Sequence, residues 1–199
     1  MSQINPDEGI REISRTIIRR GRKFDFEVLR VHAASGKDID VDLVRHGGSA
    51  VILPVLQGPE GPAIVFVRNY RYSIARTLLE IPAGTLEKGE DPRVCAGREL
   101  IEETGYRAAS VEPLAEFFPT PGMTNERMHL FLATGLHFVG QDLEEDESIQ
   151  VELVPVAQAL RMATDGTLDD GKSILAICLA AQRGLLGDQA SLAGTGRKP

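Results

Sequence analysis

The sequence predicts a protein of the α/β or α+β class, in which a mixed sheet is covered by helices and an antiparallel β-hairpin precedes it. Three observations lead to this prediction. Apolar and polar residues alternate between positions 24 and 43, as in half-exposed strands. Residues 50–56 and 63–67 are continuous apolar runs, which are typical of strands covered on both faces. Helical stretches are interleaved with further strands at 91–104, 156–164 and 173–185.

The first 46 residues are predicted to form an arm and a hairpin. Residues 1–20 are polar and mixed, and we expect a short helix or an arm there. Phe24, Phe26 and Val28 alternate with acidic residues, and residues 39–43 alternate in the same way after the turn Ser35-Gly36-Lys37-Asp38. Because a two-stranded ribbon is marginally stable alone, the hairpin should pack on another surface.

Residues 47–186 are predicted to form the main domain, and the polar tail 187–199 is expected to be disordered. Beyond the two apolar runs, strands are expected near 111–118, 127–133 and 149–154. The chain has 199 residues, of which 42% are hydrophobic and 26% are charged. This is enough for one core with an appendage.

The charge, the apolar runs and the cysteines of the sequence exclude several classes of partner and of location. A net charge of −7 repels a phosphate backbone, so nucleic-acid binding is not expected. No apolar run approaches the ~18 residues of a membrane span, and no secretory signal opens the chain. Cys95 and Cys178 belong to no CxxC pair, so free thiols in a reducing compartment are expected. These features predict a cytoplasmic protein that binds neither nucleic acid nor membrane.

The segment Gly84–Tyr106, GTLEKGEDPRVCAGRELIEETGY, carries the strongest functional signal. Asp91 can cap a helix, Pro92 is favoured at its first position, and Gly105 is favoured at its C-terminal end. At about 100° per residue, four residues fall on one arc that should pack on the sheet: Val94, Gly97, Leu100 and Ile101.

Three glutamates, Glu99, Glu102 and Glu103, fall on the other arc at spacings of three and four residues, so their carboxylates converge. A solvated acidic face is the usual fate of such a cluster. However, no Lys or Arg lies one turn away from Glu99 and Glu103 to offset like-charge repulsion. Hard divalent cations such as Mg²⁺ favour carboxylates of this kind, so the pattern favours a metal site.

The same segment resembles the signature of the Nudix hydrolases, G-x5-E-x7-R-E-U-x-E-E-x-G-U, where U is apolar. All seven fixed identities are present, and at roughly 7% usage per residue type they would coincide by chance on the order of once in 10⁸ windows. Only Tyr106 departs, because an aliphatic residue is usual there. The matching identities are Gly84, Glu90, Arg98, Glu99, Glu102, Glu103 and Gly105.

This resemblance implies a Nudix-type α/β/α sandwich with a mixed sheet. It also implies two to three Mg²⁺ or Mn²⁺ ions, held by Glu99, Glu102, Glu103 and the backbone carbonyl of Ala83. The pair formed by Arg98 and Glu90 is expected to brace the loop against the helix.

Sequence outside the motif resembles the ADP-ribose pyrophosphatase branch of this family. Leu79–Gly84 is similar to its ELPAG entry, Val67–Arg71 is similar to a V-R-Q-Y-R strand end, and Pro121 follows Tyr106 by 15 residues. The resemblance implies substrate-binding roles for Arg71, Arg68, Glu80 and Pro121. Bland alternatives remain for each, since Arg71 can be a surface charge and Pro121 can simply end a strand.

The branch takes the group that orients or deprotonates water from an acidic loop between its last strands. Glu147 is the first choice for this role and Glu144 the second, with Glu103 as a further catalytic residue. Unaided by the resemblance, a charged loop of this kind is ordinary solvated surface.

Together these expectations describe a Mg²⁺-dependent hydrolase that splits ADP-ribose into AMP and ribose 5-phosphate. Two alternatives stay open: hydrolysis of GDP-mannose or another nucleoside diphosphate sugar, and a non-catalytic ADP-ribose-binding module. The branch resemblance also implies a homodimer with exchanged N-terminal strands.

Overall fold

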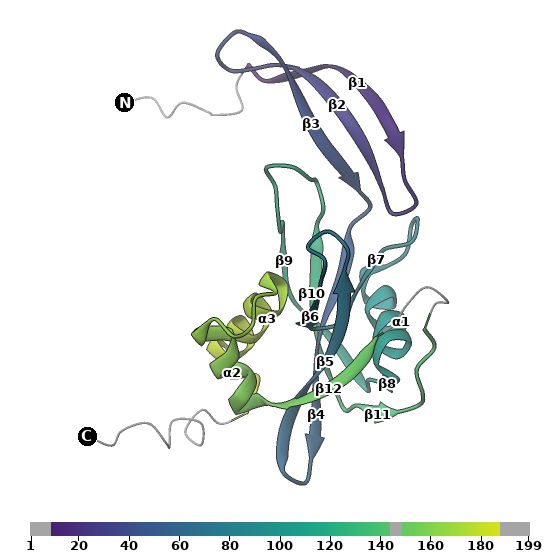
Figure 1. The fold of residues 1–199 in the computed structure, drawn as a ribbon, viewed down its shortest axis with the longest axis vertical. Coiled ribbons are helices and arrows are strands. Elements are labelled where there is room, and N and C mark those ends of the chain that lie inside the picture. The colour runs from purple at the N-terminus through teal and green to yellow at the C-terminus, as the bar shows by residue number, and fades with distance from the viewer. Residues whose placement is uncertain (1–8, 144–148, 188–199) are drawn as a thin grey trace, which may run out of the picture. The chain divides into compact units, whose positions relative to one another are not determined.

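A computed structural model of the chain describes residues 9–143 and 149–187, which form two compact units (Figure 1). The N-terminal unit comprises the residues up to Gly48 together with residues 118–127. The main unit comprises residues 49–117 and those from Met128 onward. Segment 118–127 therefore belongs with residues far from it in sequence, which the linear division at residue 46 did not anticipate.

The N-terminal unit is a three-stranded antiparallel sheet with strand order β1-β2-β3. The strands are β1 (Arg11–Arg20), β2 (Phe24–His32) and β3 (Asp38–His46). The predicted hairpin corresponds to β2 and β3. The expectation of a helix or arm was wrong for residues 11–20, because β-branched residues such as Ile13, Thr16 and Ile17 favour a strand and the edge of β2 offers it a partner.

Residues 118–127 are tied to the end of β3 by three backbone-directed hydrogen bonds. The amide of Val44 donates to the carbonyl of Met123 at 2.8 Å. The amide of His46 donates to the side-chain oxygen of Asn125 at 2.8 Å, and the Asn125 amide group returns a bond to the His46 carbonyl at 3.1 Å.

A seven-stranded mixed sheet forms the centre of the main unit, with the order β12-β5-β4-β10-β9 and with β6 and β7 paired to β5 and β4. The pair β4–β10 is parallel, and the other pairs are antiparallel. Two short strands, β8 (Tyr106–Arg107) and β11 (His137–Phe138), pair separately. The strands of the large sheet are β4 (Ser49–Gly58), β5 (Gly61–Arg71), β6 (Arg76–Glu80), β7 (Ala83–Thr85), β9 (Ser110–Phe117), β10 (Met128–Thr134) and β12 (Gln150–Pro155).

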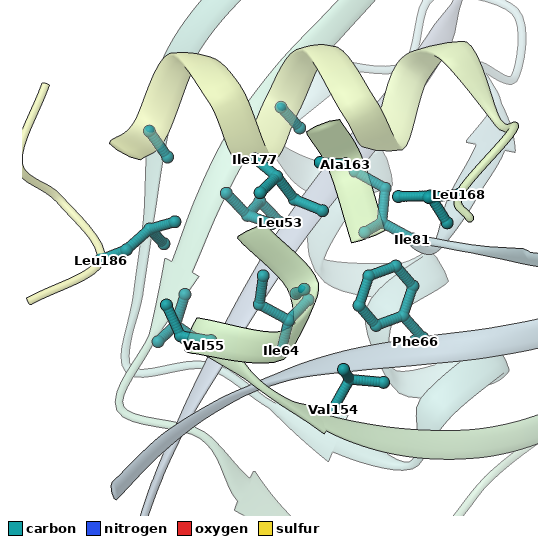
Figure 2. Close-up of a cluster of buried hydrophobic side chains, with 14 of the residues drawn as sticks. Leu53, Val55, Ile64, Phe66, Ile81, Val154, Ala163, Leu168, Ile177 and Leu186 are labelled. Carbon is teal, nitrogen blue, oxygen red and sulfur yellow. The ribbon is translucent and has the colours of Figure 1, made fainter. Parts of the chain in front are cut away.

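Helices cover both faces of this sheet, α1 (Pro92–Thr104) on one side and α2 (Val156–Asp165) with α3 (Gly171–Gln182) on the other (Figure 1). Alternate residues of β4 serve the two faces, as strand geometry requires. Leu53 packs with Phe66 and Ile177 of α3 (Figure 2), whereas Ile52 packs with Leu100 of α1. The structure confirms the predicted α/β/α sandwich and explains the continuous apolar run.

Among the residues that the structure describes, every helix is either too short or too polar to cross a lipid bilayer.

Candidate functional site

The helix α1 begins and ends where the sequence predicts. The Asp91 side chain accepts a hydrogen bond from the Arg93 amide at 2.8 Å, and Pro92 occupies the first turn. Gly105 ends the helix in the left-handed conformation with φ of 75°, and its amide donates to the Ile101 carbonyl at 2.8 Å. A Cβ atom at Gly105 would lie 2.7 Å from the Phe138 ring, so packing requires glycine there as well.

The buried face of α1 differs from the predicted arc. Val94 is 63% exposed, whereas Cys95, Ala96 and Leu100 are fully buried. The prediction was wrong because the small residues Cys95 and Ala96 allow the helix to lie close to the sheet. The Cys95 sulfur lies 3.9 Å from the Gly84 carbonyl oxygen. This rotation carries Glu103 into the contact with the sheet, where it is only 5% exposed.

Two of the three glutamates lie against the backbone of β7. The Glu103 carboxylate accepts a hydrogen bond from the Ala83 amide at 3.1 Å. The Glu99 carboxylate occupies the space above Gly84, since a Cβ atom there would lie 1.8 Å from its carbon and one of its oxygens. The structure thus brings Glu99, Glu103 and Ala83 together, and the first glycine of the motif is explained by the space that a carboxylate needs.

Arg98 lies at the centre of the acidic residues. Its Nη1 donates to Glu99 and to Glu102, each at 2.8 Å. The expectation that the acidic residues lack a cationic neighbour was therefore wrong, because Arg98 contacts Glu99 next to it and Glu102 one turn further along the helix. Glu102 is directed toward Arg98 in this arrangement.

The brace between Arg98 and Glu90 is present. Nε and Nη2 of Arg98 each donate to the Glu90 carboxylate at 3.1 Å, and the Glu87 amide donates to it at 2.9 Å. The hydrogen bond with Glu90 is the main cause of the raised pKa of Arg98, and the same bond lowers the pKa of Glu90. Loop 85–91 is thereby fixed to the helix by a charged pair.

The donors in this site suit a hard divalent cation that is shared with a substrate. Within residues 9–143 and 149–187, no three Asp, Glu, His or Cys side chains enclose a metal position by themselves. The Glu103 carboxylate lies at the Ala83 amide and the Glu99 carboxylate lies at Gly84, so both side chains offer oxygen atoms to a cation. Mg²⁺ is usually held by one or two carboxylates and completes its coordination with water and substrate phosphates, which this set fits.

Arg71, at the end of β5, is bonded to Glu80 at the end of β6. Its Nε and Nη2 donate to the two oxygens of Glu80 at 2.7 and 2.6 Å. Burial alone would lower the pKa of Arg71, but the hydrogen bonds and charge of Glu80, followed by the charge of Glu103, raise it. The guanidinium is therefore bonded to Glu80, which is 1% exposed, and is also influenced by the charge of Glu103.

Other predicted residues lie elsewhere. Arg68 pairs with Glu152 of β12 at 2.6 Å, and strand alternation places it on the face of β5 opposite to Arg71. Pro121 lies in the 118–127 segment of the N-terminal unit. Glu144 and Glu147 lie outside the described residues. Close to them in sequence, the Asp142 amide donates to the Glu102 carbonyl at 3.3 Å.

Sequence reasoning missed Lys172, which is 9% exposed and donates to Glu80 and, at 3.0 Å, to Asp170. Lys172 and Glu80 are 92 residues apart, and no motif connects them. The one local signal is Asp170, a residue type favoured at a helix N-terminus. Asp170 therefore predicts where α3 begins, but it does not predict that this helix contacts Glu80.

Comparison with known proteins places these features in a family. Residues 46–176 match a family model described as the NUDIX domain. The chain is 37% identical to an ADP-ribose pyrophosphatase of Bacillus subtilis over 167 residues, which cover 83% of this chain and 89% of that protein. It is 32% identical to a GDP-mannose pyrophosphatase of Klebsiella pneumoniae, with coverage of 74% and 81%. A solved structure described as an ADP compounds hydrolase shares the fold, with a TM-score of 0.76 at 18% identity and coverage of 89% and 95%.

Proposed function

The chain belongs to the Nudix hydrolase family, and from this premise we propose that it hydrolyses the pyrophosphate bond of a nucleoside diphosphate sugar. ADP-ribose is the proposed substrate, with AMP and ribose 5-phosphate as products. One observation carries the proposal: the carboxylates of Glu103 and Glu99 lie against the backbone of Ala83 and Gly84. The charge of Glu103 also acts on the guanidinium of Arg71, which Glu80 holds through two hydrogen bonds. Acidic groups for cations and a fixed cation for phosphate are the two requirements of a diphosphate site.

Glu99, Glu102, Glu103 and the Ala83 carbonyl are the proposed ligands of two to three Mg²⁺ or Mn²⁺ ions. When bound, such ions neutralise phosphate charge and lower the pKa of a bound water molecule. Glu102 has to exchange its bond with Arg98 for a place in this set. Arg98 keeps its two bonds to Glu90 in that exchange, so the loop stays attached to the helix.

Arg71 is proposed to contact the diphosphate, because a guanidinium matches the geometry of phosphate oxygens. Glu80 fixes its orientation through two hydrogen bonds. Arg68 and Pro121 are retained as proposed substrate contacts. Arg68 would have to leave Glu152 to take up this role.

Glu147, with Glu144 as the second choice, is proposed to accept a proton from the attacking water. The water oxygen attacks phosphorus in line with the bridging oxygen, the bridging bond breaks, and the two phosphate monoesters leave. The location of Asp142 supports this role, since its amide is bonded to the carbonyl of Glu102 on α1. In sequence, Glu147 follows Asp142 by five residues.

The N-terminal sheet is proposed to mediate a homodimer with exchanged strands. Ile18, Phe24 and Phe26 are exposed and line a hollow on this sheet. Exposed apolar clusters commonly mark interaction surfaces. A dimer mass by sedimentation equilibrium at micromolar concentration is expected, and a monomer would refute this part of the proposal.

The reaction is proposed to take place in the cytoplasm. Both cysteines are free, and burial raises the pKa of Cys95 to about 12, which keeps its thiol protonated. Unpaired thiols persist most readily in a reducing compartment.

GDP-mannose is the second candidate substrate, favoured by the similarity to a GDP-mannose pyrophosphatase. A panel of nucleoside diphosphate sugars, assayed with Mg²⁺ and ranked by kcat/KM, separates the candidates. ADP-ribose is expected to exceed the others by about tenfold or more, a difference of ~1.4 kcal/mol in transition-state binding. A higher kcat/KM for GDP-mannose would reassign the substrate, and binding of ADP-ribose without turnover would contradict catalysis.

A further inference from the structure

A chain of charged side chains extends from the partly exposed Arg71 through the buried Glu80, and the proposed reaction uses only its outer end. The chain alternates in sign through Arg71, Glu80, Lys172 and Asp170. Arg71 is partly exposed, Glu80 is buried, and the side chain of Lys172 is 9% exposed. A charge-alternating chain of this kind links the surface of the site to the start of α3.

The carboxylate of Glu80 needs more than one cation. A buried carboxylate loses its hydration, and a single partly exposed partner offsets that loss poorly. Arg71 uses both carboxylate oxygens through Nε and Nη2, and the Lys172 ammonium donates to Oε2 as well. Lys172 therefore fixes the carboxylate from the interior, on the side away from solvent.

Asp170 in turn holds Lys172 in place. It accepts from the Lys172 ammonium at 3.0 Å and from the Ser173 amide at 3.1 Å, where it caps α3. The Ser173 hydroxyl also donates to Asp170 and accepts from the Ile81 amide at 2.9 Å. Because Ile81 follows Glu80 directly, the start of α3 fixes both the backbone and the side chain at the end of β6.

This rigid support determines where the free edge of Arg71 points. Among the described residues, Nη1 of Arg71 has no hydrogen-bond partner, whereas Nε and Nη2 are bonded to Glu80. The charge of Glu103 also acts on the guanidinium. A guanidinium held along one edge presents the other edge in a fixed direction, which reduces the entropy lost when it binds a phosphate.

We infer that Lys172 and Asp170 are positioning residues that act through Glu80 to hold Arg71 in the orientation in which it binds the diphosphate. The inference rests on the proposed function, since it assigns Arg71 to the phosphates. It adds that part of the phosphate-binding site is built by α3, on the opposite face of the sheet from α1.

The test combines a spectroscopic and a kinetic measurement on the full-length protein. The Nε–H signal of Arg71, identified by its absence in Arg71→Lys, is expected to exchange slowly with solvent in the wild type. In Lys172→Met the exchange should accelerate by about tenfold or more, because Glu80 loses its inner partner. Unchanged exchange would overturn the inference, and this measurement does not depend on turnover.

The kinetic arm is a double-mutant cycle with the preferred substrate of the panel. Lys172→Met is expected to lower kcat/KM by roughly ten- to a hundredfold, the loss typical of a misplaced contact group. In an Arg71→Met background the same substitution should change kcat/KM by less than about twofold, because the two act in series. Losses that multiply would show that Lys172 acts independently of Arg71 and would overturn the inference.

Two further variants separate positioning from folding. Asp170→Asn keeps a good helix cap but removes the charge facing Lys172, so kcat/KM should fall while the thermal midpoint stays nearly constant. Arg76→Met removes an exposed ion pair with Asp169, next to Asp170 in sequence, and should leave both measurements unchanged. If the wild type cleaves no nucleoside diphosphate sugar, the proposed function fails while the exchange measurement still decides this inference.

Discussion

The acidic and the basic parts of the site differ in how far apart their residues lie in the sequence. The acidic part lies within one 23-residue segment, Gly84–Tyr106, in which a turn, a cap and a helix fix every relative position. The basic part joins Arg71 and Glu80 to Lys172, across 92 residues from Glu80 and onto a helix on the other face of the sheet. Local geometry can be read from residue spacing, because helix periodicity converts it into distance. Residues that meet only through the tertiary fold have no regular spacing in the sequence.

The largest expected effect belongs to the local part. Glu103→Gln should reduce kcat by roughly 10²–10³-fold, because a proposed ligand of the divalent cation loses its charge. Glutamine can still accept the Ala83 amide hydrogen bond, so the thermal midpoint should move by less than about 2 °C. Steady-state kinetics and thermal unfolding provide the two readouts. Glu116→Gln, an exposed acid on β9, is the control, and retained activity in Glu103→Gln would remove this residue from the site.

A second substitution tests the close approach of loop and helix. Gly84→Ala would place a Cβ atom 1.8 Å from the Glu99 carboxylate, which then has to move. We expect kcat to fall by about 100-fold and the free energy of unfolding to fall by ~1–3 kcal/mol.

The matched control is Gly97→Ala within α1, where a new Cβ meets open space. It should stabilise the protein by about 0.5–1 kcal/mol and leave kcat unchanged. If both alanines behaved alike, Gly84 would have no special role.

The brace between loop and helix should affect stability more than chemistry. Glu90→Gln should cost about 1–3 kcal/mol at pH 7, because Arg98 loses a charged partner that it meets through two hydrogen bonds. The pKa of Glu90 is lowered from its ordinary 4.5, so its stabilising effect is complete above that pH and is lost as the pH falls through the folded-state pKa. Denaturant unfolding of both proteins from pH 7 to pH 3 should show the difference closing below about pH 4.5. A constant difference would contradict the charged brace.

The smallest effect is expected at Arg68. Its ion pair with Glu152 is solvent-exposed, and such pairs contribute about 0–1 kcal/mol. Arg68→Met should leave the thermal midpoint nearly unchanged and raise KM by less than about threefold, because Arg68 has to leave Glu152 before it can contact substrate. If Arg68→Met raised KM more than Arg71→Met does, Arg68 and not Arg71 would be the main phosphate contact. That contact would then lie on the other face of β5.

The same contrast explains how far the sequence could be interpreted. The continuous apolar runs of β4 and β5 and the caps of α1 predicted their elements, because each signal is local. The strand at residues 11–20 was missed because it has no alternating apolar pattern of its own and depends on pairing with β2. The buried arc of α1 was misplaced by one residue, since Val94 is apolar but Cys95 and Ala96 are small enough to approach the sheet.

In the candidate site, too, local features could be predicted from the sequence, whereas tertiary contacts could not. Spacing predicted that Glu99 and Glu103 lie close together, but it put them on the arc away from the sheet, whereas Glu103 lies in the contact with the sheet. Resemblance added the Ala83 peptide, which no side-chain pattern reveals. The pair formed by Arg98 and Glu102 has a spacing of four residues and was open to prediction, but only positions one turn from Glu99 and Glu103 were considered. Lys172 was out of reach, because it meets Glu80 only through the tertiary fold.

The most direct test of the central claim is a crystal structure of the wild-type protein soaked with Mn²⁺, analysed by anomalous scattering. The account predicts a manganese peak within coordination distance of Glu99, Glu103 and the Ala83 carbonyl, at about 2.0–2.3 Å by analogy with hard divalent ions. The peak should disappear in Glu103→Gln crystals grown and soaked in the same way. A peak at other acidic residues, or none in this part of the wild-type protein, would contradict the claim that these carboxylates bind divalent cations.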